Sequence, residues 1–254
     1  MDGATLVTSQ VGDGVATIVL DSADNRNALS GRLLAQLAEA LSNATAAADV
    51  HALVLTGTGT VFCSGADLSD PPSNDPDRPF SYPDVLRSLS ECPKPTLARV
   101  NGHARAGGLG LVAACDIAVG PADATFAFSE VRLGLVPAII AVVCQRVMPA
   151  RAFAHYTLTG EVFDGAAAAA CGLLTHCVPA WELEEVVSGI LAALHQTEPN
   201  AVAMTKQLIA ELPTLPTGDA FARAAAISVE RFESAEGREG IAAFREKRRP
   251  SWAW

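Results

Sequence analysis

The sequence is short of positive charge. Lys and Arg total 18 against 28 Asp and Glu, so the formal net charge at pH 7 is −10, and no basic stripe with interleaved aromatic side chains occurs. These absences argue against nucleic acid as a partner. Charged residues make up 18% of the 254 residues and hydrophobic residues 50%. That balance is typical of a packed chain, in one domain or one domain with an appendage, rather than of a disordered one.

Paired cysteine motifs are also missing. The six cysteines show no C-x-x-C spacing and no paired framework, and the histidines have no metal-ligand spacing. We therefore expect reduced, mostly buried thiols and no metal. Cys63 lies beside Ser64, but neither a G-x-S-x-G pattern nor a neighbouring base accompanies them, so a catalytic cysteine is not expected.

Signals for export or for a membrane are lacking too. The N-terminal residues MDGATLVTSQ contain neither a basic segment nor an apolar one, so no signal peptide is expected. The longest apolar run, residues 133–144, is too short to span a bilayer. The sequence thus predicts a cytoplasmic protein with no membrane partner.

What the chain does contain is an alternation of short strands and helices in its first half. A helix is expected over residues 33–41, with Ser30 as its cap, because leucines recur there at helical spacing. Five prolines make residues 70–83 a loop or a lid. Strands are predicted at residues 14–21, 52–56, 95–101, 115–119 and 125–128. Such alternation is typical of an α/β fold with substantial parallel pairing.

In the second half, strand signals fade from about residue 136. Alanine-rich segments with helical periodicity follow instead, and Pro199 suits a first helical residue. Helices are predicted at residues 182–195, 199–212, 218–232 and 235–247. The last of them ends in a basic cluster of Arg245, Lys247, Arg248 and Arg249. This cluster either binds a polyanionic ligand or only complements the dipole at a helix end.

Two glycine-bearing segments place backbone amides, rather than side chains, in prominent positions. Residues 61–68 (VFCSGADL) follow a strand, and residues 101–110 (NGHARAGGLG) open a helix. Glycine allows close backbone approach, and the first N–H groups of a helix are unpaired and lie at its positive end. Two such amides aimed at one carbonyl oxygen would stabilise an oxyanion, each by about 2.7–4 kcal/mol in the transition state. Taken singly, each segment is more simply a tight packing turn.

Together and in this order, the two segments resemble those of the enoyl-CoA hydratase/isomerase (crotonase) family. The resemblance covers nearly the whole chain. It includes DNRNALS at 24–30, AACDIAV at 113–119, FSEVRLGL at 128–135, LTGEVFD at 158–164, GLLTHCV at 172–178 and EGREGIAAFREKR at 236–248. It implies an α/β fold, with a crotonase-like spiral of ββα units over residues 1–195 and a C-terminal helical trimerisation region over 196–254. The implied assembly is a homo-oligomer, either a trimer or a hexamer.

The same resemblance assigns roles to particular residues. It implies that the N–H groups of Ala66 and Gly107 form an oxyanion hole for a thioester carbonyl and that Glu130 is the catalytic acid/base. A positioned carboxylate of this kind contributes about 10²–10⁴-fold to a rate. The implied substrate is an acyl-CoA, so coenzyme A is part of the substrate and no separate cofactor is expected. Its predicted contacts are Arg26, Ala28, Ser64, Asp67, Leu68 and Lys247, although Asp67 also suits a local turn or cap.

Two departures from the family pattern bear on activity. Gly110 stands three residues after Gly107, where ordinary enoyl-CoA hydratases carry a second glutamate that shares the attacking water. Residues 138–141 (AIIA) replace a glycine-rich turn and would narrow the acyl pocket.

The single-glutamate pattern resembles that of 3-methylglutaconyl-CoA hydratases and also that of Δ3,Δ2-enoyl-CoA isomerases. Residues 130–141 and the tail are closer to the first group. Hydration of a 2-enoyl-CoA is therefore the predicted activity, with isomerisation as the first alternative. A non-catalytic acyl-CoA-binding paralogue is the second alternative, and the presence of Glu130 argues against it.

Overall fold

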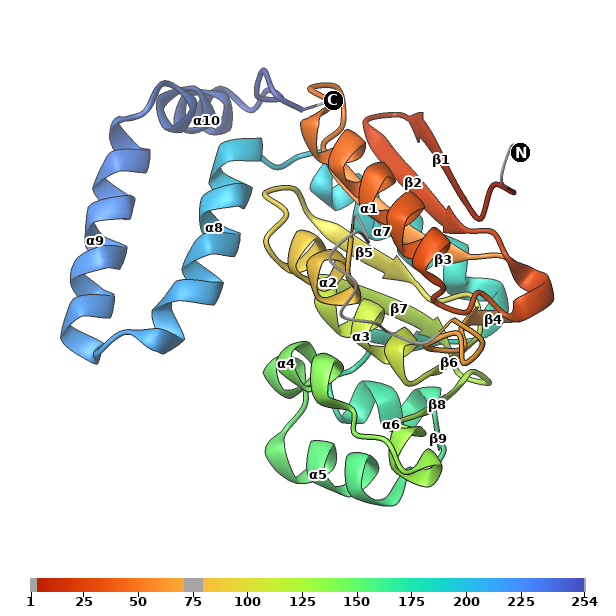
Figure 1. Ribbon diagram of the computed structural model, residues 1–254. Coiled ribbons are helices and arrows are strands. Elements are labelled where there is room, and N and C mark those ends of the chain that lie inside the picture. Colours follow the sequence, from red (N-terminus) through yellow and green to blue (C-terminus); the bar gives the residue numbers. More distant parts are fainter. Residues whose placement is uncertain (1–3, 71–79, 254) are drawn as a thin grey trace.

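A computed structural model describes residues 4–70 and 80–253, and its framework is a six-stranded sheet (Figure 1). The strands, in spatial order, are β1 (Val7–Gly12), β2 (Val15–Leu20), β3 (Ala52–Gly57), β5 (Thr96–Arg99), β7 (Ile117–Pro121) and β10 (His176–Val178). All neighbouring pairs are parallel except the β1–β2 hairpin. The first five residues of β3 are buried in succession, as expected for an inner parallel strand that is covered on both faces.

A smaller sheet has the order β4-β6-β8-β9. Its strands are β4 (Val61–Cys63), β6 (His103–Arg105), β8 (Thr125–Ala127) and β9 (Phe163–Asp164). In three successive units, a strand of the large sheet is followed by a strand of the small sheet and then by a helix. The predicted α/β spiral of ββα units is thus confirmed.

Helices cover both faces of the large sheet. On one face α1 (Gly31–Ala46), α2 (Tyr82–Ser90) and α3 (Gly107–Ala114) are successive neighbours, and α4 (Ala138–Val147) packs on α3 (Figure 1). Every residue of α3 is buried. On the other face, Leu183 and Val187 of α7 (Leu183–Leu194) pack against Val54 and Leu97 of the inner strands. The helix α3 therefore occupies the centre of the molecule.

The chain ends in three helices, α8 (Pro199–Glu211), α9 (Thr217–Glu233) and α10 (Ala235–Glu246), which we call the C-terminal arm. Figure 1 shows α8 and α9 extending away from the sheet. The described residues of α8 include none that is buried, and α9 and α10 bury one each, Ile227 and Ala243. The predicted boundary between residues 195 and 196 falls in the turn between α7 and α8. Whether the arm is a separate trimerisation region stays a prediction.

Several elements differ from the sequence-based expectation. Helix α2 begins at Tyr82, inside the segment expected to be a loop over residues 70–83, because Pro83 and a capping box of Ser81 and Asp84 start a helix there. The rest of that predicted loop, residues 71–79, lies outside the described residues. The sequence-based prediction also missed the helices α4, α5 (Ala150–Thr159) and α6 (Gly165–Ala170) and the short strands β1, β4, β6, β9 and β10. Within residues 4–70 and 80–253, no helix is both long and apolar enough to cross a membrane.

Candidate active site

The first glycine-bearing turn leaves β4 and is fixed by a bridge to Leu29. Leu29 N donates to Gly65 O at 2.8 Å, and Asp67 N donates to Leu29 O at 3.3 Å. In a parallel bridge the residue between these two points its own N–H to the opposite side. That residue is Ala66, and no acceptor for its N–H is found among the described residues. Gly65 has φ +90°, a conformation that glycine adopts readily.

The second turn joins β6 to α3 through a strained residue. Ala106 has φ +47° and ψ −118°, a combination that costs a non-glycine residue about 1–3 kcal/mol. A hydrogen bond of 2.9 Å from Ala106 N to Ala127 O ties this turn to the strand that precedes Glu130. Gly107 follows as the first residue of α3, so its N–H has no partner within the helix and lies at the positive end of the helix dipole.

The two turns are in direct contact. A methyl group placed on Gly65 would lie 2.8 Å from Ala106 Cβ and 3.3 Å from Gly107 N. One placed on Gly108 would lie 2.5 Å from Cys63 O. Side chains cannot be accommodated at these approaches, which explains why glycine is found there. The amides of Ala66 and Gly107 thus belong to touching turns; that they share one carbonyl oxygen stays a prediction.

The Glu130 carboxylate is set apart from other polar groups. Glu130 begins the 3₁₀ helix η2 (Glu130–Leu133), which is closed by Gly134 in the left-handed conformation. Within the described part of the chain, its Oε2 is the only buried side-chain oxygen or nitrogen with no hydrogen-bond partner. Burial raises the pKa of Glu130 above its ordinary value. A half-buried carboxylate that has one unpartnered oxygen and a raised pKa is suited to proton transfer.

The turn that follows η1 (Ala23–Asn25) brings three of the predicted substrate contacts next to the first glycine-bearing turn. Arg26 adopts the left-handed conformation, and its carbonyl accepts from Ser64 N at 3.1 Å. The hydroxyl of Ser64 donates to Asn25 O at 3.5 Å, and Ala28 is buried. Arg26, Ala28 and Ser64 therefore lie together beside the first turn.

The sequence-based prediction did not include Asn27, which links the turn after η1 to the segment around β4. Asn27 is fully buried; its Nδ2 donates to three carbonyls, those of Thr58, Val61 and Phe62, at 2.8–3.2 Å. Its Oδ1 accepts from Ser22 N at 2.9 Å. Asn27 has φ +55°, which asparagine tolerates better than most residues. The motif DNRN contained this signal, but its side-chain partners could be known only from the fold.

The other predicted contacts have different surroundings. The carboxylate of Asp67 accepts from Ser69 N at 2.9 Å and from Ser69 Oγ at 2.6 Å, and these bonds lower its pKa. It therefore caps a local turn, as its position also suggested. Leu68 is 69% exposed. Cys63 is fully buried, and burial raises the pKa of its thiol to about 12, as expected for an inert cysteine.

The basic cluster of the tail is only partly available. Lys247 ends α10 in the left-handed conformation, and α10 lies apart from α3 in Figure 1. A single chain therefore does not bring Lys247 to the two turns. Arg248 is held by carboxylates, at 2.6 and 2.8 Å from Glu239 and 2.6 Å from Glu246. Much of its charge is thus neutralised locally, so phosphate binding by this cluster would rest chiefly on its other members.

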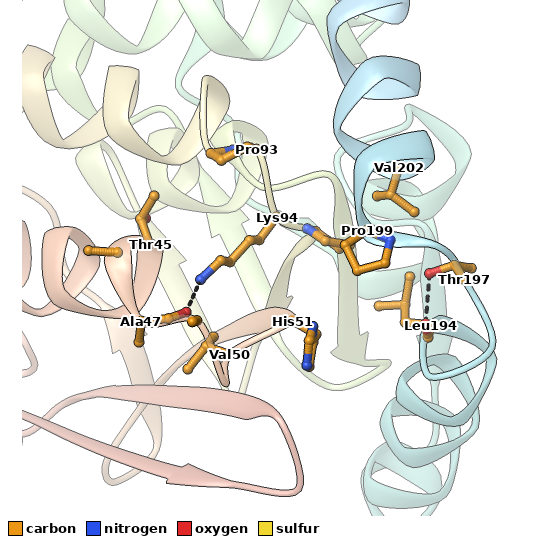
Figure 2. Close-up of a pocket in the computed structure, with 13 residues that line it drawn as sticks. Thr45, Ala47, Val50, His51, Pro93, Lys94, Leu194, Thr197, Pro199 and Val202 are labelled. Atoms are coloured by element: carbon orange, nitrogen blue, oxygen red, sulfur yellow. Dashed lines mark hydrogen bonds between the residues drawn. The ribbon is translucent and has the colours of Figure 1, made fainter. Parts of the chain in front are cut away.

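A hollow elsewhere on the molecule contains none of the predicted site residues. It has a volume of about 300 Å³ and lies between the end of α1, the start of β5 and the α7–α8 junction (Figure 2). The ammonium group of Lys94, which lines it, donates to the carbonyls of Ala44 and Ala47 at 2.9 and 2.6 Å. The ammonium group is therefore already bonded to the end of α1. The hollow is separate from the site around Glu130.

The chain is similar over nearly its whole length to known proteins of one family. The sequence model described as enoyl-CoA hydratase/isomerase matches residues 10–253. The mitochondrial enoyl-CoA hydratase domain-containing protein 3 of Danio rerio is 31% identical over 99% of this chain and 89% of its own length. Among solved structures, an enoyl-CoA hydratase of Mycobacterium smegmatis has a TM-score of 0.90 and 32% identity, covering 98% of this chain and 99% of that one. AtuE of Pseudomonas aeruginosa has a TM-score of 0.91 and 32% identity, covering 98% and 100%.

Proposed function

The chain belongs to the enoyl-CoA hydratase/isomerase family, and from this premise we propose that it adds water across the 2,3 double bond of an enoyl-CoA thioester. The observation that carries the proposal is the carboxylate of Glu130: it is half-buried, has an unpartnered Oε2 and a raised pKa, and follows the strand that is tied to the Gly107 turn.

The proposed mechanism uses two backbone amides and one side chain. The N–H groups of Ala66 and Gly107 donate to the thioester oxygen, and they stabilise the negative charge that develops there when C3 is attacked. Glu130 takes a proton from the attacking water as the new C3–O bond forms. The same carboxyl then delivers a proton to C2, so that H and OH are added and Glu130 returns to its starting state.

Isomerisation of a 3-enoyl-CoA to a 2-enoyl-CoA is the second candidate. It is favoured by Gly110, which provides no second carboxylate near Glu130. In this reaction Glu130 would remove a proton from C2 and return it to C4 while the amides hold the enolate. No water has to be positioned, so one base is sufficient.

We propose that the protein acts as a homo-oligomer, a trimer or a hexamer, assembled through the C-terminal arm. The arm exposes Phe221, Phe232 and Phe244 by 67–86%, and large apolar groups gathered on one part of a chain are typical of an interface. Lys247 would then approach the coenzyme A moiety bound to a neighbouring copy. Arg26, Ala28 and Ser64 would contact it from within the same chain, with Asp67 and Leu68 at the rim.

A substrate panel tests the proposed function. Crotonyl-CoA, a 3-methyl-branched enoyl-CoA, a carboxylate-bearing enoyl-CoA and a 3-enoyl-CoA are offered to the purified protein, with Glu130→Gln as the control. We expect slow hydration of crotonyl-CoA and faster hydration of a branched or carboxylate-bearing substrate. Rapid conversion of the 3-enoyl-CoA with hydration of no panel member would establish the isomerase instead. Tight acyl-CoA binding with no conversion would indicate the non-catalytic role.

A further inference from the structure

The space where a second catalytic carboxylate would project is filled by another side chain. A Cβ atom on Gly110 would overlap the phenolic oxygen of Tyr82 and would lie 2.5 Å from Cγ2 of Ile140. Tyr82 comes from the start of α2 and Ile140 from α4, the two helices that flank α3. The glycine at position 110 and the tyrosine at position 82 are therefore sterically coupled, although 28 residues separate them in the sequence.

Tyr82 is held firmly at this place. The capping box fixes the first turn of α2, with Ser81 N donating to Asp84 Oδ2 at 3.0 Å and Ser81 Oγ at 2.6 Å. Three buried residues, Val85, Leu86 and Leu89, anchor the rest of α2 in the core. The ring of Tyr82 packs over Gly107, whose Cβ would lie 3.6 Å from Cε1 of the ring. Its orientation is thus set by packing on both sides.

The hydroxyl of Tyr82 donates one hydrogen bond and is still able to accept another. It donates its proton to the carbonyl of Gly107, the residue whose N–H is the proposed oxyanion donor. Burial, the neighbouring thiols of Cys63 and Cys144 and the carboxylate of Glu130 raise the pKa of Tyr82 well above its ordinary value, so the phenol stays protonated. The phenolic oxygen lies where a side chain at position 110 would begin, the position from which the second glutamate of ordinary hydratases shares the attacking water. A phenolic oxygen that has donated its proton still accepts a hydrogen bond.

We infer that the Tyr82 hydroxyl holds the attacking water opposite Glu130, in the place that the second carboxylate fills in two-glutamate hydratases. This inference rests on the proposed hydration. One O–H of the water would point to the phenolic oxygen and the other to the carboxylate of Glu130, which leaves a lone pair of the water directed at C3. Glu130 takes the proton, the C3–O bond forms and C2 is protonated. The phenol gives up no proton during the reaction.

The test separates holding the water from shaping the oxyanion turn. Exchange of the C2 proton of a saturated acyl-CoA such as butyryl-CoA into D₂O needs the amides and Glu130 but no attacking water. Tyr82→Phe keeps the ring and removes only the hydroxyl. Its turnover for hydration should fall about 10- to 100-fold, the range expected for losing one hydrogen bond to a reacting group. Its rate of proton exchange should stay within about twofold of the parent.

The chain provides a matched control, because it contains only one other tyrosine. Tyr156 lies in α5, where its ring stacks on Phe163 at 4.0 Å, so Tyr156→Phe should leave both rates unchanged. Gly110→Glu is not an informative variant, since its side chain would overlap Tyr82 and Ile140.

Each outcome is decisive. Equal losses of hydration and exchange in Tyr82→Phe would show that the hydroxyl acts only through Gly107, and unchanged hydration would show that it has no role; both overturn the inference. A parent protein that exchanges the C2 proton but hydrates no substrate would overturn the proposed function itself, and with it this role of the phenol. That result is visible before any variant is made.

Discussion

The region around α3 and the C-terminal arm bury their side chains in opposite ways. All eight residues of α3 are buried, and glycines there let backbone meet backbone without intervening side chains. The three helices of the arm bury two residues between them, Ile227 and Ala243. The core around the site is thus completed within one chain, whereas the arm leaves most of its apolar side chains exposed. Activity should therefore be sensitive to the loss or gain of single atoms around α3. Changes in the C-terminal arm should affect assembly instead.

The largest expected effect comes from Glu130, the side chain that moves the proton in the proposed mechanism. Glu130→Gln should lower turnover at least about 10²-fold, because proton transfer needs an exchangeable carboxyl. The loss should appear in steady-state kinetics on a confirmed substrate. Near-normal turnover in this variant would show that another group moves the proton.

The same variant should not be less stable. Burial raises the pKa of Glu130 from 4.5, so between 4.5 and the raised value the folded state binds more protons than the unfolded state. The ionised carboxylate therefore destabilises the fold as pH rises through this window. Glu130→Gln should raise the melting temperature at pH 7, and the difference should disappear below pH 4.5, as measured by thermal unfolding across pH.

Adding one methyl group in each region sharpens the comparison. Gly108→Ala would place a carbon 2.5 Å from Cys63 O, which should lower the free energy of unfolding by about 1–3 kcal/mol and disturb the amide of Gly107. Gly218→Ala in α9 meets nothing within 4 Å and should be neutral or stabilising by up to about 1 kcal/mol. Urea denaturation measures both. Similar changes in the free energy of unfolding for the two variants would show that the two regions do not differ in packing.

Replacing the exposed aromatic residues of the arm should change assembly more than folding. Phe221, Phe232 and Phe244 changed together to Ser should shift the protein towards the monomer, because the interface loses its largest apolar groups. Light scattering over a concentration series measures the mass. Val11→Ser on the edge strand β1, where Val11 is 52% exposed, is the control and should leave the mass unchanged. If the triple variant keeps the mass of the parent, the arm is not the interface.

The smallest effect is expected at the end of the arm. Lys247→Ala should raise the Michaelis constant for acyl-CoA about two- to fivefold at low salt and leave turnover unchanged, since an exposed charge pair contributes about 0.2–1 kcal/mol. The difference should shrink as salt is added. A fall in turnover without a change in the Michaelis constant would instead make Lys247 a structural residue of the interface.

The longer strands and helices could be predicted from the sequence because their signals are local. In β2 and β3, β-branched residues predict a strand over six residues, and in α1 the spacing of the leucines predicts a helix. The strands β9 and β10 have only two and three residues, too few for a period to be visible. For α2 the capping pattern of Ser81 and Asp84 was readable but lay at the edge of a proline-rich segment.

The candidate site was predictable only where it depends on backbone. The paired glycines of the two turns indicate close approach whatever surrounds them. The role proposed for Glu130 came from a family resemblance, because the missing hydrogen-bond partner of its Oε2 is a property of the folded chain. The partnership of Tyr82 with Gly110 is wholly tertiary. The sequence around Tyr82 and the sequence around Gly110 give no sign that side chains at these two positions would overlap.

The thiol of Cys63 lies between the two glycine-bearing turns, so its reactivity can report on their separation. Its Sγ accepts from Gly65 N at 3.5 Å, and Gly108 is packed against its backbone. Burial raises the pKa of this thiol to about 12, so the reactive thiolate is scarce at pH 7. Alkylation of Cys63 therefore has to wait until the turns separate. Its rate, followed by mass spectrometry on the native protein, would measure how often the two turns separate, and a thioester bound in the proposed oxyanion hole should lower that rate.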